Sequence, residues 1–141
     1  MKSQVSLFKV LADANRQRIL HLLSERELFV CQLMAVLGLS QPLVSRDLSL
    51  LERQGLLEAR RDGKQVYYRL AQDLPPLAKS VLAALVREWR QLEIPRTDLR
   101  ALEQLHRRFA NQDGICDMAA VRRYLDFRNG QRNENPSHKE K

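Results

Sequence analysis

The stretch LGLSQPLVSRDLSLL, residues 37–51, decides the fold. Gly38 predicts the end of one helix, because glycine takes left-handed backbone angles at low cost. Ser40 predicts the N-cap of the next helix, and Pro42 is compatible with its first turn. Gly55 predicts where that second helix stops. A helix, a short glycine turn and a second helix have the spacing of a helix-turn-helix unit.

The second of these helices, residues 41–54, has an apolar and a polar face, because residues three or four apart share one side. The apolar stripe consists of Val44, Leu48 and Leu51. The polar stripe, nearly free of acidic residues, consists of Gln41, Ser45 and Ser49, with Arg46 beside it. Gln and Arg reach base edges with paired hydrogen bonds, and Ser serves bases or phosphates. Together with Ser40 and Pro42 at the helix start, this face predicts a DNA contact in the major groove.

A β-hairpin is predicted directly after this helix, in LLEARRDGKQVYYRL, residues 56–70. Asp62-Gly63 is a strong signal for a tight two-residue turn. Val66, Tyr68 and Leu70 alternate onto one face, and the basic residues Arg60, Arg61 and Lys64 gather at the tip. This basic wing, residues 60–64, is expected to lie on the DNA backbone.

Further helices are expected on both sides of the helix-turn-helix unit. Residues 4–12 place Val5, Phe8 and Leu11 on one side of a short helix. Asp13 is a good N-cap for the next helix, and a third helix is predicted over residues 30–37. Asp73 is expected to cap a long helix that runs to residue 92 and ends before Pro95. Its apolar stripe consists of Leu77, Val81, Leu85, Trp89 and Leu92.

The C-terminal third predicts an added helical part and a polar tail. Leu99, Leu102, Leu105 and Phe109 form one stripe, and Met118, Val121 and Leu125 form another. We therefore divide the chain into a DNA-binding and dimerisation domain (1–95), a helical extension (96–128) and a disordered tail (129–141). The predicted class is mainly α with a small β-hairpin, a winged helix-turn-helix domain.

Composition and motifs limit the kinds of molecule that the protein is expected to bind and the activities it is expected to have. The 141 residues carry a net charge of +7, which favours nucleic acid or an anionic membrane. No apolar run is long enough to span a membrane, and we expect a cytoplasmic protein that does not act at membranes. The sequence has no Gly-rich phosphate loop, nucleophile elbow or His-Glu metal motif, so we expect no enzymatic activity.

Residues 11–70 closely resemble the ArsR/SmtB family of winged-helix repressors. The matching pieces are LADANRQRIL, ELFVCQL, LGLSQPLVSRDLSLL and GLLEARRDGKQVYYRL, in that order. The resemblance implies a homodimer that binds a double-stranded DNA operator and releases it when an effector arrives. It also implies that the first and fifth helices build the dimer interface. Asp47 departs from the family, which usually has histidine there, and we expect it to point away from DNA or to alter the sequence preference.

The effector is less defined, because the family's inducer sites are only partly present. Arsenic-responding members begin the third helix with Cys-Val-Cys and another cysteine three residues later. Here that box reads Phe29-Val30-Cys31-Gln32-Leu33-Met34, so one cysteine survives. The zinc site of the fifth helix is absent, since residues 74–93 contain no histidine. His21 is interpreted as a surface or partly packed imidazole.

Cys31 and Cys116 are the two cysteines, and both are predicted near helix starts, which favour the thiolate form. Two interpretations remain. In the first, the thiols bind As(III) or another soft metal ion, which acts as the inducer. In the second, the protein has no metal site, and it responds to an oxidant or an organic ligand or uses its winged helix as a protein-interaction module.

Overall fold

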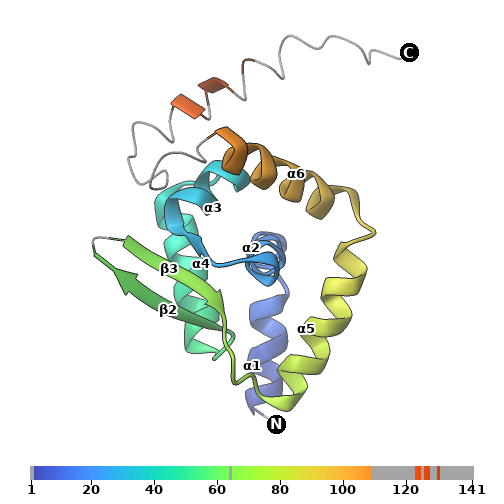
Figure 1. Cartoon of the computed structure of the whole chain (residues 1–141). Coiled ribbons are helices and arrows are strands. Elements are labelled where there is room, and N and C mark those ends of the chain that lie inside the picture. The colour runs from blue at the N-terminus through green and yellow to red at the C-terminus, as the bar shows by residue number, and fades with distance from the viewer. Residues whose placement is uncertain (1, 64, 109–122, 125, 128–129, 131–141) are drawn as a thin grey trace.

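The computed structural model describes residues 2–63, 65–108, 123–124, 126–127 and 130. Along the chain the elements are α1 (Lys2–Leu11), α2 (Ala14–Glu25), β1 (Leu28–Phe29), α3 (Val30–Leu37), α4 (Gln41–Arg53), β2 (Leu57–Asp62), β3 (Gln65–Leu70), α5 (Pro76–Trp89) and α6 (Glu93–Arg108). The helices surround α2, and the β2–β3 hairpin projects from one side (Figure 1). The predicted class, mainly α with a hairpin, is confirmed.

The helix-turn-helix unit forms at the predicted residues. Gly38 ends α3 with a left-handed φ of 69°, and its N–H donates to the Met34 carbonyl oxygen. Asp13 caps α2, since its carboxylate accepts from the Arg16 backbone N–H at 3.0 Å. Ser40 stands at the N-cap of α4, but its side chain makes no capping hydrogen bond. The capping function predicted for that hydroxyl is therefore wrong, although its position is right.

The hairpin gains a third strand. The antiparallel sheet has the order β1-β3-β2, with Phe29 of β1 opposite Tyr67 of β3. Asp62 pairs with Gln65, so Asp62 ends β2 and Gly63, with φ 61°, begins the turn. The predicted Asp-Gly turn is thus displaced by one residue. The strand β1 was missed because two residues are too few to show an alternating pattern.

The start of α5 corrects the predicted cap at Asp73. The helix begins at Pro76, with Pro75 at its N-cap at φ −53° and ψ 145°, outside the helical region. A residue that precedes proline avoids helical angles, which excludes both Leu74 and Pro75 from the helix. The helix also ends at Trp89 rather than at residue 92.

Pro95 lies inside a helix rather than between two helices, and the division of the chain into three parts stays a prediction. This proline is buried within the first turn of α6, where proline is tolerated, so the predicted boundary between residues 95 and 96 falls inside a helix. Helix α6 packs across α2 and α3 (Figure 1), with Leu102 and Leu105 in the hydrophobic core. The second predicted stripe and the tail lie outside the described residues, apart from short pieces between 123 and 130.

The predicted apolar side of helix α1 is only partly buried. Leu7, Val10 and Leu11 are buried in the core, whereas Val5 and Phe8 are 48% and 52% exposed. The sequence shows apolar residues on more than one side of this helix. Only packing against α2 decides which of them is covered.

Candidate nucleic-acid interface

Helix α4 presents the polar face that its sequence predicts. Val44, Leu48 and Leu51 are completely buried and fix one side of the helix against the core. The predicted DNA-contacting residues of the unit are all exposed: Ser40, Gln41, Pro42, Ser45, Arg46 and Ser49. The face they form bears no acidic side chain before the last turn of the helix. It can therefore approach a polyanion closely.

The start of α4 is open to solvent. Ser40 is exposed and extended, and its hydroxyl makes no cap bond. The first N–H groups of a helix point outward and attract anions. This end of α4 is suited to a phosphate of the DNA backbone, with the Ser40 hydroxyl as an additional donor.

The wing is less uniformly basic than its sequence indicates. The Arg60 guanidinium forms an ion pair with Glu27 and lies 4.5 Å above the ring of Tyr67. The hydrogen bond to Glu27 raises the pKa of Arg60 above its usual value. Asp62 lies 3.8 Å from the same guanidinium. These carboxylates offset the charge of Arg60, so it is a weaker phosphate ligand than its place in the sequence suggests.

Arg61 differs from Arg60 because successive strand residues point to opposite faces. It pairs with Val66 across the hairpin, is exposed, and has no ion pair within the described part of the chain. It is therefore the hairpin arginine whose charge is available to DNA. Lys64, the other predicted wing contact, lies outside the described residues. No sequence signal pointed to Glu27 as the partner of Arg60, since 33 residues separate them.

A second exposed surface is apolar. Val5 and Phe8 of α1 and Leu77 of α5 are each 40–55% exposed. The first turn of α5 lies beside α1 at the end of the molecule away from α6, whereas the other end of α5 leads into α6 (Figure 1). Trp89, by contrast, is only 3% exposed, so the predicted stripe of α5 divides between the core and the surface.

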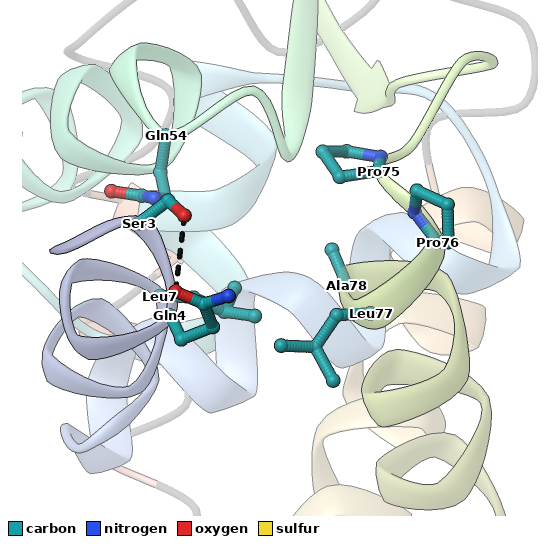
Figure 2. A pocket seen from close by; sticks show the side chains of 8 residues that line it. All are labelled: Ser3, Gln4, Leu7, Gln54, Pro75, Pro76, Leu77 and Ala78. Carbon is teal, nitrogen blue, oxygen red and sulfur yellow. Dashed lines mark hydrogen bonds between the residues drawn. The ribbon is translucent and has the colours of Figure 1, made fainter. Parts of the chain in front are cut away.

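A small pocket of about 240 Å³ joins this surface to the end of α4. Figure 2 shows Ser3 and Gln4 of α1 on one side, Gln54 above them, and Pro75, Pro76 and Leu77 on the other side. None of its lining side chains is charged. The pocket thus places α1, α5 and the last residue of the helix-turn-helix unit around one space.

A larger pocket, of about 390 Å³, lies where α2 meets the corner between α5 and α6. Trp89, Leu92, Ile94 and Pro95 make most of its lining apolar. The Trp89 indole N–H donates to Gln17 at 3.3 Å, which connects the pocket wall to the first turns of α2. Its size and lining suit a small organic molecule.

His21 is more deeply buried than the surface or partly packed imidazole that was expected. It is fully buried in α2, with its ring edge-on to Trp89 at a centroid distance of 5.7 Å. Neither ring nitrogen has a hydrogen-bond partner among the described residues. Burial lowers the pKa of this imidazole, which favours its neutral form.

The predicted effector residues are only partly placed. Cys31 lies half-buried in the first turn of α3, next to the core. Met34 is buried, and the N–H of Phe29 donates to the Gln32 side chain at 2.9 Å, which completes the helix start that Phe29 cannot cap. Cys116 lies outside the described residues. Within the described ranges, no three His, Cys, Asp or Glu side chains are grouped as metal ligands would be.

The geometry defines a winged helix-turn-helix protein with a polar recognition face. Among the described residues, no helix is both long and apolar enough to cross a bilayer. Residues 13–59 match the family described as bacterial regulatory protein, arsR family. The arsenical resistance operon repressor of Escherichia coli is 48% identical over 79 residues, which is 55% of this chain and 68% of that protein.

Two solved structures agree with the fold. Reduced HlyU from Vibrio cholerae has a TM-score of 0.57 at 33% identity, over 64% of this chain and 92% of that one. A homodimeric winged helix-turn-helix DNA-binding domain from Mycobacterium bovis has a TM-score of 0.54 at 31% identity, over 65% of this chain and 83% of that one. The chain belongs to the ArsR family of bacterial regulatory proteins.

Proposed function

We propose that the protein is a homodimeric transcriptional repressor. In this proposal α4 reads an operator in the major groove, the wing contacts the backbone, and an effector releases the complex. The observation that carries it is the face of α4. Three buried residues (Val44, Leu48 and Leu51) hold the helix, while the side chains suited to base edges, Gln41 and Arg46, are exposed.

The homodimer is supported by the apolar surface of α1 and α5. Exposed Val5, Phe8 and Leu77 would be covered by the same surface of a second copy, as twofold symmetry requires. Two copies would place two recognition helices one DNA turn apart, about 34–36 Å, on a palindromic site.

We propose a thiol-reactive effector such as As(III), acting at Cys31, with Cys116 as a candidate second thiol. Support comes from the place of Cys31 in the first turn of α3, which packs directly against α4. A ligand bound there would shift the start of α3 and disturb the recognition helix. The E. coli relative is named as an arsenical resistance repressor, which agrees with this class of signal.

An organic effector is the second candidate, and the larger pocket at the α5–α6 corner favours it. Trp89 lines this pocket and is the one tryptophan of the chain. Its fluorescence would report a ligand there without any label. Use of the winged helix as a protein-interaction module is the third alternative, which salt dependence separates from DNA binding.

The experiment is fluorescence anisotropy with a duplex that the protein selects from a randomised pool. We expect Arg46→Ala to weaken binding to this duplex by about 1–3 kcal/mol, with little change on random DNA. Arg100→Ala, which removes an exposed arginine from α6, is the matched control. Binding without sequence preference, or binding insensitive to salt, would contradict the repressor proposal.

The effector is tested on the preformed complex by adding As(III), Cu(I), Zn(II) or peroxide. Release by one agent in the wild type, but not in Cys31→Ser or Cys116→Ser, would support the thiol proposal. A complex that resists all four agents would contradict it and favour the organic ligand.

A further inference from the structure

Asp47 occupies the buried side of α4, although the next residue in the chain, Arg46, is exposed. Its side chain is only 3% exposed. The Oδ1 atom accepts a hydrogen bond from Nη1 of Arg16 in α2, at 3.3 Å. Asp47 is therefore directed away from the DNA-facing side of α4, and its negative charge is balanced by Arg16.

Arg16 connects three helices through one guanidinium group. Its Nε donates to the carbonyl oxygen of Val10 at 2.6 Å, and its Nη2 reaches that of Lys9 at 3.4 Å. These are among the last carbonyl groups of α1. The Arg16 backbone N–H donates to the Asp13 cap that begins α2. The Nη1 atom of Arg16 lies 3.3 Å from Oδ1 of Asp47 in α4 and 3.9 Å from Oδ2 of Asp13.

The ion pair adds what apolar packing does not supply. Val44, Leu48 and Leu51 fix how deeply α4 lies, but hydrophobic contacts have no preferred direction. A charge-assisted hydrogen bond has a defined length and angle. Asp47 is two residues from both Ser45 and Ser49, which on a helix places it on nearly the opposite side. The bond therefore restrains the rotation of α4 about its axis, and with it the aim of the polar face.

We propose that Arg16 and Asp47 are positioning residues that set the sequence specificity of α4 without touching DNA. This proposal rests on the proposed function of α4 in reading an operator. It assigns the pair a role in discrimination between sequences, because a small rotation would misplace paired hydrogen bonds to bases but would leave attraction to phosphates nearly intact.

The test compares the dissociation constants for the selected duplex and for random DNA in the full-length protein. Asp47→Leu keeps the site buried but removes the acceptor, and Asp47→Asn keeps an acceptor oxygen. Both remove the same charge, so each is the electrostatic control for the other. The specificity ratio is the dissociation constant for random DNA divided by that for the selected duplex. We expect this ratio to be about tenfold lower in Asp47→Leu than in Asp47→Asn.

This ratio distinguishes a merely structural defect, because partial unfolding weakens binding to both duplexes by the same factor. Arg16→Gln should reduce the ratio as well, and Asp47→Leu should add no further loss in that background. Equal ratios for Asp47→Leu and Asp47→Asn would overturn the proposal. The proposed function would still stand if the wild type bound the selected duplex more tightly than random DNA. A wild type that fails to discriminate would remove the proposed function, and this proposal with it.

Discussion

Arg18 of α2 and Asp98 of α6 form a two-pronged ion pair. The Nε and Nη2 atoms of Arg18 donate to the two carboxylate oxygens of Asp98 at 2.8 and 2.9 Å. The Asp98 side chain is 5% exposed, and its hydrogen bond raises the pKa of Arg18 above the usual value. This contact joins α6 to the central helix of the fold, across the boundary that the sequence suggested.

We expect Asp98→Ala to lower the free energy of unfolding by about 2 kcal/mol, because it leaves Arg18 without its strong partner. Urea unfolding followed by circular dichroism measures this loss. Glu103→Ala is the matched control, since it removes an exposed ion pair with Arg107 on the same helix. That control should change stability by less than about 0.5 kcal/mol. Equal effects of the two variants would mean that α6 is not held by Arg18.

The free energy of unfolding is expected to decrease as the pH is lowered, because of His21. Burial lowers its pKa most strongly, Arg90 lowers it further, and Glu25 and Asp98 oppose the shift. In the unfolded chain His21 has a pKa of about 6.5, so near and below this pH it binds more protons there than in the folded chain. The contribution of His21 is thus complete above about pH 6.5 and is lost as pH falls from there toward the lowered folded pKa.

Replacement of His21 tests this directly. His21→Leu fills the site without unpaired ring nitrogens, so we expect about 1 kcal/mol more stability at pH 6. The decline of stability below pH 6.5 should become shallower, although His106, whose pKa burial also lowers, retains a share. His138→Gln is the control for a histidine change elsewhere. An unchanged pH profile in His21→Leu would show that His21 does not cause the decline.

The two wing arginines should behave differently on DNA. Arg61→Ala is expected to weaken all sequences alike and to reduce the slope of log affinity against log salt by about 1. Arg60→Ala should have the smaller effect, because Glu27 and Tyr67 already engage that guanidinium. Anisotropy at several salt concentrations measures both. A larger salt effect for Arg60→Ala would show that DNA displaces Glu27 from Arg60.

Phe8→Glu is expected to dissociate the proposed homodimer, since it places a charge in the apolar surface of α1 and α5. Analytical sedimentation measures the mass of the protein in solution. Affinity for the operator should decrease as the dimer is lost. Ser6→Glu introduces the same charge at another exposed position of α1 and should leave the dimer intact. If Ser6→Glu dissociated the protein as fully as Phe8→Glu, charge rather than the apolar surface would be responsible.

Local signals explain why much of the fold and interface was predictable. Gly38, Asp13 and Pro42 act on the backbone of their own neighbourhood, and their effects need no distant partner. The polar face of α4 follows from the helical period alone once Val44, Leu48 and Leu51 are buried. Its exposure in the structure matches that prediction, and its contact with DNA stays a prediction.

By itself, the sequence determined the order of helices and hairpin, the two faces of α4 and the resemblance to a repressor family. The tertiary structure alone decided which charges remain available. It paired Arg60 with Glu27, Arg18 with Asp98 and Arg16 with Asp47, across separations of 33, 80 and 31 residues. It also buried His21 and left Phe8 exposed. The physical reason is that periodicity acts within one element, whereas burial and ion pairing depend on which elements pack together.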